Sequence, residues 1–427
     1  MHLLRGVGLC RDDYDYIDIT NPFLRKIPIA IPVFKKMSLD HATAKLSKET
    51  SDLLSTTLEF TGYFKIMDRD AFLLDPQNAA ASSAVKFHNW TSIGAELLVT
   101  GGVAIKDNRL EIELRVYDTF KEHMLVGKRY KAGLVDKRKI IRRFCSELIY
   151  ILTGDRGIFD SKIAYVSTNS GHKEIYICEF DGYNPKRLTN HKSITLSPAW
   201  SSDGKWLAYT SYLKGKPDLY IKHLTENRRS VIAKEGINIS PAWVPGEFRL
   251  TATLSFSGDP EIYLLTGTGK MIKRLTKKRG IDVSPTWSPD GKKMAFVSKR
   301  SGSPQIYIKD IDSGRVNRLT FEGHYNTQPS WSPKGDRIVY SGMKQGRSDI
   351  YVIASDGQNL VQLTHNEGNN ESASWSPDGS LIVFSSTREG PSRIYVMTAF
   401  GTDQRRLIAF PGEQTEPQWS PRLSTGH

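Results

Sequence analysis

The sequence is poor in cysteine, and this shortage excludes two kinds of site. Its 427 residues include three cysteines, Cys10, Cys145 and Cys178. Three cysteines cannot form a disulfide framework, and none of them lies in a Cys-x-x-Cys pair. Thiol redox chemistry and a zinc knuckle therefore have no support in the sequence.

Long apolar runs are also missing. No stretch approaches the ~18 apolar residues that a membrane-spanning helix needs, which excludes an integral helical membrane protein. The composition, 39% hydrophobic and 25% charged, is typical of a water-soluble globular protein.

Common catalytic signatures are absent as well. No serine has glycine at both −2 and +2, and neither H-E-x-x-H nor a glycine-rich phosphate loop occurs. The ten histidines show no ligand spacing. Asp203, Asp290 and Asp378 recur at one position of an Asp-Gly or Asp-Gly-like turn, so we interpret them as turn residues. The sequence predicts no catalytic residue, no metal site and no cofactor.

What the sequence does have is a repeat. Six tryptophans follow one another at spacings of 43, 44, 44, 44 and 44 residues: Trp200, Trp243, Trp287, Trp331, Trp375 and Trp419. Four of them stand in related contexts: SPAWSSDG at 197–204, SPTWSPDG at 284–291, PSWSPKG at 329–335 and SASWSPDG at 372–379. An apolar strand and a strand with an Ile-Tyr or Leu-Tyr pair follow, and the unit usually closes with a short strand such as Arg-Leu-Thr. A period in the forties is typical of four-stranded propeller blades, with the tryptophans in the core.

The register of the repeat predicts the number of blades. Residues 163–189 hold three strands with no tryptophan strand before them, and residues 416–421 hold a tryptophan strand with nothing after it. Joined, the two fragments complete one blade. We therefore expect an all-β six-bladed propeller over residues 158–427, closed by pairing of its two ends, which removes exposed sheet edges.

Residues 14–157 lack the repeat and predict a small α/β domain. Helical spacing covers 38–60, 87–93 and 135–152. Strands are expected at 27–34, whose prolines suggest an edge, and at 63–67, with a hairpin formed by 96–104 and 110–117 around Asp107 and Asn108. The fold class is thus an N-terminal α/β domain followed by the propeller.

The net charge of +13 makes nucleic acid a partner to consider. The one dense basic run, KRKIIRR at 137–143, has helical spacing and no interleaved aromatic residues, and we interpret it as a solvated helix face. The other basic residues are scattered over turns, so no nucleic-acid partner is predicted.

The segments that lead into the tryptophan strands meet at one end of a propeller channel. Their amides, hydroxyls and carboxylates would form a polar ring suited to docking a polypeptide or a cation. The candidate binding residues are Thr195, Asn238, Asp282, Asn326, Gln328, Asn370, Glu371, Glu413 and Glu416.

The domain order, the repeats and the segment IDITNPFLRKIPIAIPVF at 17–34 together resemble the TolB family of the Tol–Pal envelope system. The resemblance implies a monomeric, non-enzymatic periplasmic adaptor that supports outer-membrane integrity and cell division. It implies binding of the lipoprotein Pal at the channel mouth, contacts with other Tol or outer-membrane proteins, and membrane association only through partners. It further implies that residues 1–13 are the remnant of a signal peptide.

In that family an N-terminal segment engages TolA and can fold back on the protein, coupling TolA binding to Pal release. The matching residues here are Tyr14, Tyr16, Ile17, Asp18, Ile19, Phe23 and Arg25. Two alternatives stay open. A nucleic-acid binder would retain DNA in a steeply salt-dependent manner. A propeller hydrolase or lyase would need two cooperating channel carboxylates, and Glu371 and Glu416 are the candidate pair.

Overall fold

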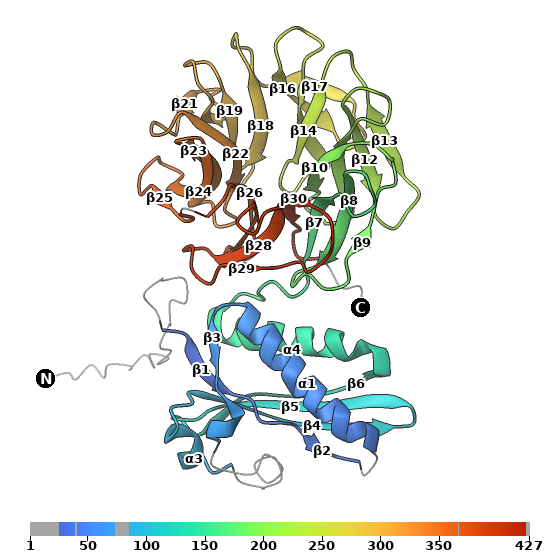
Figure 1. Ribbon diagram of the computed structural model, residues 1–427, viewed down its shortest axis with the longest axis vertical. Helices are drawn as coiled ribbons and strands as arrows, with labels where there is room; N and C mark the ends of the chain where they lie inside the picture. The colour runs from blue at the N-terminus through green and yellow to red at the C-terminus, as the bar shows by residue number, and fades with distance from the viewer. Residues whose placement is uncertain (1–24, 39–40, 73–84, 366, 424–427) are drawn as a thin grey trace, which may run out of the picture.

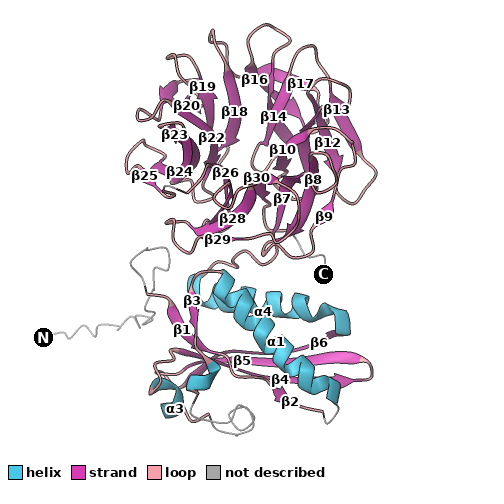
Figure 2. Ribbon diagram, in the orientation of Figure 1, coloured by secondary structure: helices cyan, strands magenta, loops and turns pink. Residues whose placement is uncertain are grey.

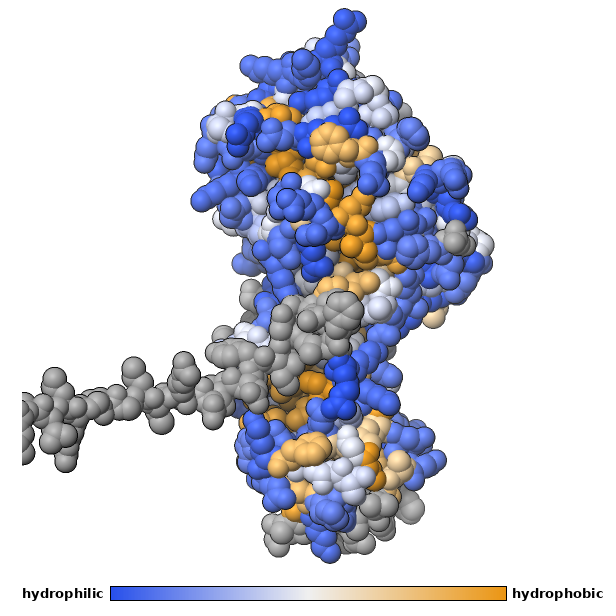
Figure 3. Space-filling view, turned by 90° about the vertical axis from the view of Figure 1, so that its left-hand side faces the viewer, coloured by the Kyte–Doolittle hydropathy of each residue, from blue (hydrophilic) through white to orange (hydrophobic). Residues whose placement is uncertain are grey.

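The computed structural model describes residues 25–38, 41–72, 85–365 and 367–423. It shows an α/β domain below a β-propeller (Figure 1). On the face seen in Figure 3, hydrophilic side chains predominate over the propeller, and apolar side chains show between them in an interrupted band. No helix among the described residues is long and apolar enough to cross a bilayer.

The N-terminal domain is built on one mixed sheet with the strand order β3-β1-β4-β5-β6, and β2 pairs with β4. Helices α1 and α4 contact each other and cover one face of the sheet (Figure 2). The strands are β1 (Ile27–Ala30), β2 (Lys35–Lys36), β3 (Phe64–Ile66), β4 (Leu97–Lys106), β5 (Arg109–Asp118) and β6 (His123–Gly133). The helices are α1 (His41–Phe60), α3 (His88–Thr91) and α4 (Lys137–Thr153), with 3₁₀ turns η1 (Arg69–Ala71) and η2 (Leu134–Asp136).

The hairpin predicted around Asp107 and Asn108 is confirmed. These two residues join β4 to β5 and have φ values of 49° and 58°. A two-residue turn with both φ values positive matches the twist of the flanking strands, and Asp and Asn tolerate that conformation well.

The edge position expected for the first strand is wrong, because β1 lies between β3 and β4. Pro28 is accommodated there because its missing N–H falls where β4 has only begun. Its carbonyl still accepts a hydrogen bond from Glu96 N at 2.9 Å. Strand β6 was not predicted at all.

The propeller has six four-stranded antiparallel sheets arranged around a channel. The innermost strands are β10 (Thr195–Trp200), β14 (Asn238–Trp243), β18 (Asp282–Trp287), β22 (Tyr325–Trp331), β26 (Asn370–Trp375) and β30 (Gln414–Trp419). The second strands are β7 (Lys162–Ser167), β11 (Trp206–Ser211), β15 (Arg249–Leu254), β19 (Lys293–Ser298), β23 (Arg337–Lys344) and β27 (Leu381–Ser386).

The outer half of each blade is formed by a third strand and a short fourth one. The third strands are β8 (Glu174–Glu179), β12 (Asp218–His223), β16 (Glu261–Thr266), β20 (Gln305–Asp310), β24 (Arg347–Ala354) and β28 (Arg393–Thr398). The fourth are β9 (Lys186–Arg187), β13 (Arg229–Ile232), β17 (Met271–Arg274), β21 (Val316–Arg318), β25 (Val361–Gln362) and β29 (Arg405–Arg406). All six repeat tryptophans are buried between blades.

One blade is assembled from both ends of the propeller segment. Strand β30 pairs antiparallel with β7, in the register Gln414↔Ser167 and Trp419↔Ile163. The ring therefore closes through hydrogen bonds between residues more than 240 positions apart. The boundary expected at 157/158 falls between the end of α4 and the start of β7.

The recurrent Asp-Gly turns behave as structural features. Asp203 accepts hydrogen bonds from Ser201 Oγ and from Lys205 N, so its carboxylate closes the turn between β10 and β11. Asp290 makes the equivalent contacts with Ser288 and Lys292, and the Ser288 hydroxyl lowers the pKa of the Asp290 carboxyl. These contacts confirm the interpretation of the repeated aspartates as turn residues.

The two domains share one continuous apolar core. Phe60 of α1 packs edge-on against Phe180, with ring centroids 5.5 Å apart. Arg138 of α4 pairs with Asp181 at 2.6 Å and with Glu179 at 3.0 Å. The basic run at 137–143 is thus only partly a solvated face, because Arg138 joins the domains.

Candidate functional site: the channel mouth

The third residue before each repeat tryptophan lies in the left-handed region of backbone conformation. These residues are Ser197, Ser240, Ser284, Gln328, Ser372 and Glu416, with φ between 50° and 57°. Each stands where the pairing of the inner and second strands shifts register. A bulge of this kind re-aims a side chain, and here it forms a ring of six around the channel, which we call the bulge ring.

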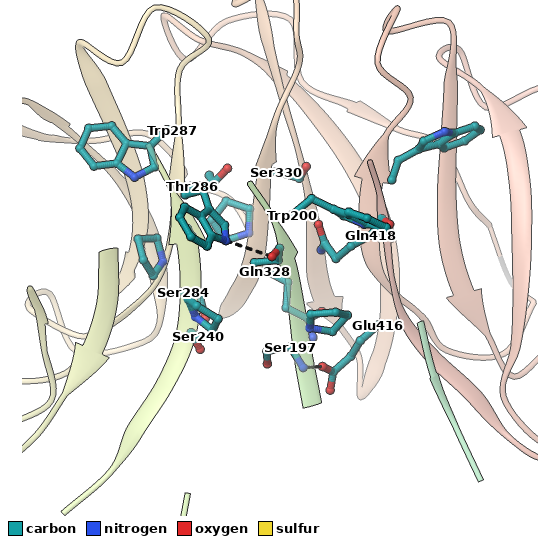
Figure 4. A pocket seen from close by; sticks show the side chains of 18 of the residues that line it. Ser197, Trp200, Ser240, Ser284, Thr286, Trp287, Gln328, Ser330, Glu416 and Gln418 are labelled. Atoms are coloured by element: carbon teal, nitrogen blue, oxygen red, sulfur yellow. Dashed lines mark hydrogen bonds between the residues drawn. The ribbon is translucent and has the colours of Figure 1, made fainter. Parts of the chain in front are cut away.

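The bulge ring surrounds a cavity of about 490 Å³. Its wall consists of hydroxyl groups, prolines, alanines, two glutamine amides, the carboxyl group of Glu416 and the tryptophans Trp200, Trp243, Trp287 and Trp419. Figure 4 shows Ser197, Ser240, Ser284, Gln328 and Glu416 of the ring around this cavity. A second cavity of about 220 Å³ shares Trp287, Ser330, Gln418, Trp419 and Pro421 with the first, so the channel continues past the tryptophans toward the turns that follow the inner strands.

Five of the nine predicted binding residues are buried between blades. They occupy the start of the inner strands and are at most 2% exposed: Thr195, Asn238, Asp282, Asn326 and Asn370. Each hydrogen-bonds within the propeller. Asn326 Nδ2, for example, donates to Gln305 Oε1 at 2.8 Å, and Asn370 Nδ2 donates to Asp349 Oδ1 at 3.2 Å. Their arrangement favours a role in positioning the mouth, and direct contact with a partner stays a prediction.

Gln328 and Glu416 are the two predicted residues that line the cavity. Gln328 Oε1 accepts a hydrogen bond from the backbone N–H of Ser372, the next member of the bulge ring, at 3.0 Å. Glu416 Oε2 accepts in the same way from the backbone N–H of Ser197 (Figure 4). Burial raises the pKa of the Glu416 carboxyl, although the Ser197 hydrogen bonds oppose this shift.

The other two predicted carboxylates lie outside the cavity wall. Glu371 precedes the ring residue Ser372 and is half-buried, while Glu413 is exposed just before β30. The structure therefore does not bring Glu371 and Glu416 together in the cavity.

The predicted TolA-binding segment is described only at its end. Tyr14, Tyr16, Ile17, Asp18, Ile19 and Phe23 lie outside the described residues. Arg25 is exposed and forms an ion pair with Glu96 at the start of β4.

The described residues offer no cluster of three or more His, Cys, Asp or Glu that could hold a metal ion. Cys145 and Cys178 are buried, and burial raises the pKa of both thiols. Since the thiolate is the reactive form, neither cysteine is poised for chemistry.

Sequence reasoning missed the wall of the site. The ring residues stand in a strand sequence, Ser-Pro before Trp200, Trp243 and Trp287, and this sequence does not indicate which side chain faces the channel. The usable signal was the repeat itself: a position that recurs in every blade beside the innermost tryptophan must face the channel or the neighbouring blade.

Taken together, an α/β domain joined to a six-bladed propeller with a polar, bulge-lined channel defines a two-domain propeller protein with its candidate site at the channel mouth. The chain belongs to the TolB family. The model of the TolB amino-terminal domain matches residues 15–125, and that of the TolB beta propeller domain matches residues 150–423.

Individual relatives agree with this assignment. The chain is 60% identical over 265 residues to the Tol-Pal system protein TolB of Desulfosudis oleivorans, which covers 62% of this chain and 60% of that protein. It is 45% identical over 264 residues to the TolB homolog of Chlorobaculum tepidum, covering 62% and 59%. The matches thus span about three-fifths of the length of these relatives. The crystal structure of TolB from Acinetobacter baumannii superposes with a TM-score of 0.79 at 27% identity, covering 93% of this chain and 97% of that one.

Proposed function

We propose that this protein is a non-enzymatic adaptor of the Tol–Pal system that works in the periplasm. In this proposal it binds Pal at the channel mouth and TolA through its N-terminal segment, and so supports outer-membrane integrity and cell division. The observation that carries the proposal is the polar cavity inside the bulge ring, in a chain of the TolB family whose relatives are named as Tol-Pal proteins.

The chemistry of the cavity favours binding over catalysis. A channel hydrolase or lyase needs an acid and a base that face one substrate. Glu416 is the one ionisable residue in the wall of this cavity, and Glu371 is not part of that wall. The wall otherwise offers hydroxyl groups and aromatic faces, which suit recognition of a peptide segment.

The roles of the predicted residues can be divided accordingly. Gln328 and Glu416 would contact Pal from the cavity wall, while Glu371 and Glu413 would do so from its rim. The five buried residues would hold the inner strands in place. Surface charge around the mouth would act on the rate and specificity of encounter more than on affinity.

The N-terminal segment would supply the second contact. Arg25, the first described residue, pairs with Glu96 next to β4, so the described chain begins on the α/β domain. If TolA binding shifts this segment between two states that differ in Pal affinity, the two partners are coupled reciprocally.

The site can be tested by filling it. Ser284→Tyr places a ring in the cavity, whereas Val231→Tyr adds the same ring on an exposed outer strand. Calorimetric titration with the periplasmic domain of Pal should show affinity lost in the first variant and kept in the second. Unchanged affinity in Ser284→Tyr would remove the channel from the proposal.

The TolA arm is tested by deletion of residues 14–25. The shortened protein should lose TolA binding and change its affinity for Pal. If both affinities stay as in the full chain, there is no switch in this segment.

A further inference from the structure

The bulge ring carries a single charge. Its six members are four serines, one glutamine and one glutamate, and no other residue in the cavity wall is ionisable. Glu416 therefore sets the electrostatic character of a space whose other described groups are uncharged: hydroxyls, two glutamine amides, prolines, alanines and tryptophans.

The carboxylate of Glu416 has no counter-ion in the described part of the chain. Its described hydrogen-bond donors are both on Ser197, and Lys173 attracts it only at a distance. Glu416 is half-buried, and a carboxylate that is partly withdrawn from water without an ion-pair partner costs stability.

The structural role of Glu416 does not need the charge. Gln328 occupies the equivalent position two blades away and accepts the same hydrogen bond, from Ser372 N at 3.0 Å, with a neutral amide. The carbonyl oxygen of a glutamine at 416 could accept from Ser197 equally well. The geometry of the ring therefore does not explain why residue 416 carries a negative charge.

The surroundings fit a cationic group. Trp200 and Trp419 form part of the same wall, and the face of a tryptophan ring attracts an ammonium or guanidinium ion. The prolines beside them can pack along the aliphatic stem of a lysine or arginine while its head reaches the carboxylate.

We infer that the segment which occupies the channel brings in a cationic group, a lysine ammonium, an arginine guanidinium or a chain-terminal amine, and that this group pairs with Glu416. This inference rests on the proposed function, since it describes the chemistry of the partner at the same site.

The test compares two variants, each of which loses one negative charge at a different place in the protein. Glu416→Gln keeps the hydrogen bond to Ser197 and loses the charge inside the cavity. Glu122→Gln loses the same charge on the α/β domain, in the exposed turn between β5 and β6. With the periplasmic domain of Pal, Glu416→Gln should weaken binding at least tenfold, because it leaves the partner cation unpaired, and Glu122→Gln should stay within about twofold.

The outcomes separate the inference from the function. If Pal binds the parent protein and Glu416→Gln equally well, the inference is overturned while Pal binding at the mouth stands. If chelation of divalent ions abolishes binding by the parent, Glu416 serves a metal ion and the inference is again overturned.

If Pal does not bind the parent protein, the proposed function fails, and a probe without Pal decides the inference. Butylguanidinium should raise the Tm of the parent and of Glu122→Gln, with a clearly smaller rise for Glu416→Gln. An equal rise in all three proteins would contradict a cation site at Glu416.

Discussion

At the scale of single residues, the channel mouth combines backbone strain with a carboxylate that has no described ion-pair partner. The six ring residues have positive φ although none is glycine, and each such residue costs about 1–3 kcal/mol. Glu416 adds a carboxylate whose pKa is raised by burial. Both features are unfavourable for folding alone, which is the pattern expected of a binding site.

The raised pKa gives a prediction about stability. The folded protein holds the Glu416 proton more tightly than the unfolded chain does, so ionisation removes stability as pH rises from the unfolded pKa through the folded one. Glu416→Gln should therefore have a higher Tm than the parent at pH 7, and the difference should vanish near pH 4. Calorimetry across this range measures it; a lower Tm for Glu416→Gln at pH 7 would contradict the account.

At the scale of elements, buried hydrogen bonds between neighbouring blades hold the inner strands; we call each such set of bonds a polar clamp. Asn370 donates to Asp349 Oδ1 of the preceding blade and accepts from Arg388 Nη2 at 3.1 Å. Asp349 is itself buried, so it depends on these partners. Asn370, the first residue of the inner strand β26, thus links two neighbouring blades two residues before the ring residue Ser372.

Asn370→Ala should lower the free energy of unfolding by about 1–3 kcal/mol, because it leaves buried polar atoms without partners. Glu413→Ala, on the exposed rim, should change it by less than about 0.5 kcal/mol. Urea denaturation of both variants checks this, and equal stabilities would show that the clamp contributes nothing.

The sequence predicted elements well where periodicity was strong and failed where tertiary pairing decided. The tryptophan spacing located all six inner strands, and the Asp107–Asn108 turn located the β4–β5 hairpin. Strand β6 lacks a regular alternation of apolar and polar residues, because Lys128, Arg129 and Lys131 occupy its second half. Its partners explain it: Lys131 and Arg129 lie opposite Glu111 and Glu113 on β5 and form ion pairs with them.

The candidate site was predicted only in part for a similar reason. The repeat predicted polar residues at the mouth. It did not predict which of these side chains faces the channel and which faces the neighbouring blade. That choice depends on the bulge: Asn326 stands two residues before Gln328, yet Asn326 is buried between blades and Gln328 lines the cavity.

At the scale of the whole molecule, closure of the ring and contact between the domains define one body. The composite blade joins β30 to β7, and the apolar core runs from α1 into the propeller. The channel mouth is therefore held in shape by contacts spread over the entire chain.

A chain that ends at Gly412 lacks β30 and leaves the inner edge of β7 unpaired. We expect it to associate or aggregate through that edge, whereas a chain that ends at Leu423 keeps all the described strands. Size-exclusion chromatography distinguishes the two. A monomeric, equally stable product ending at Gly412 would show that closure is dispensable.

The central claim, that Pal docks at the channel mouth, is tested most directly by site-specific photo-crosslinking in living cells. A benzoylphenylalanine at Glu413 stands on the rim of the mouth, and one at Val135, which is 93% exposed, stands on the α/β domain. The account predicts a crosslink to Pal from position 413 and none from position 135. Crosslinks to Pal from position 135 alone would contradict it.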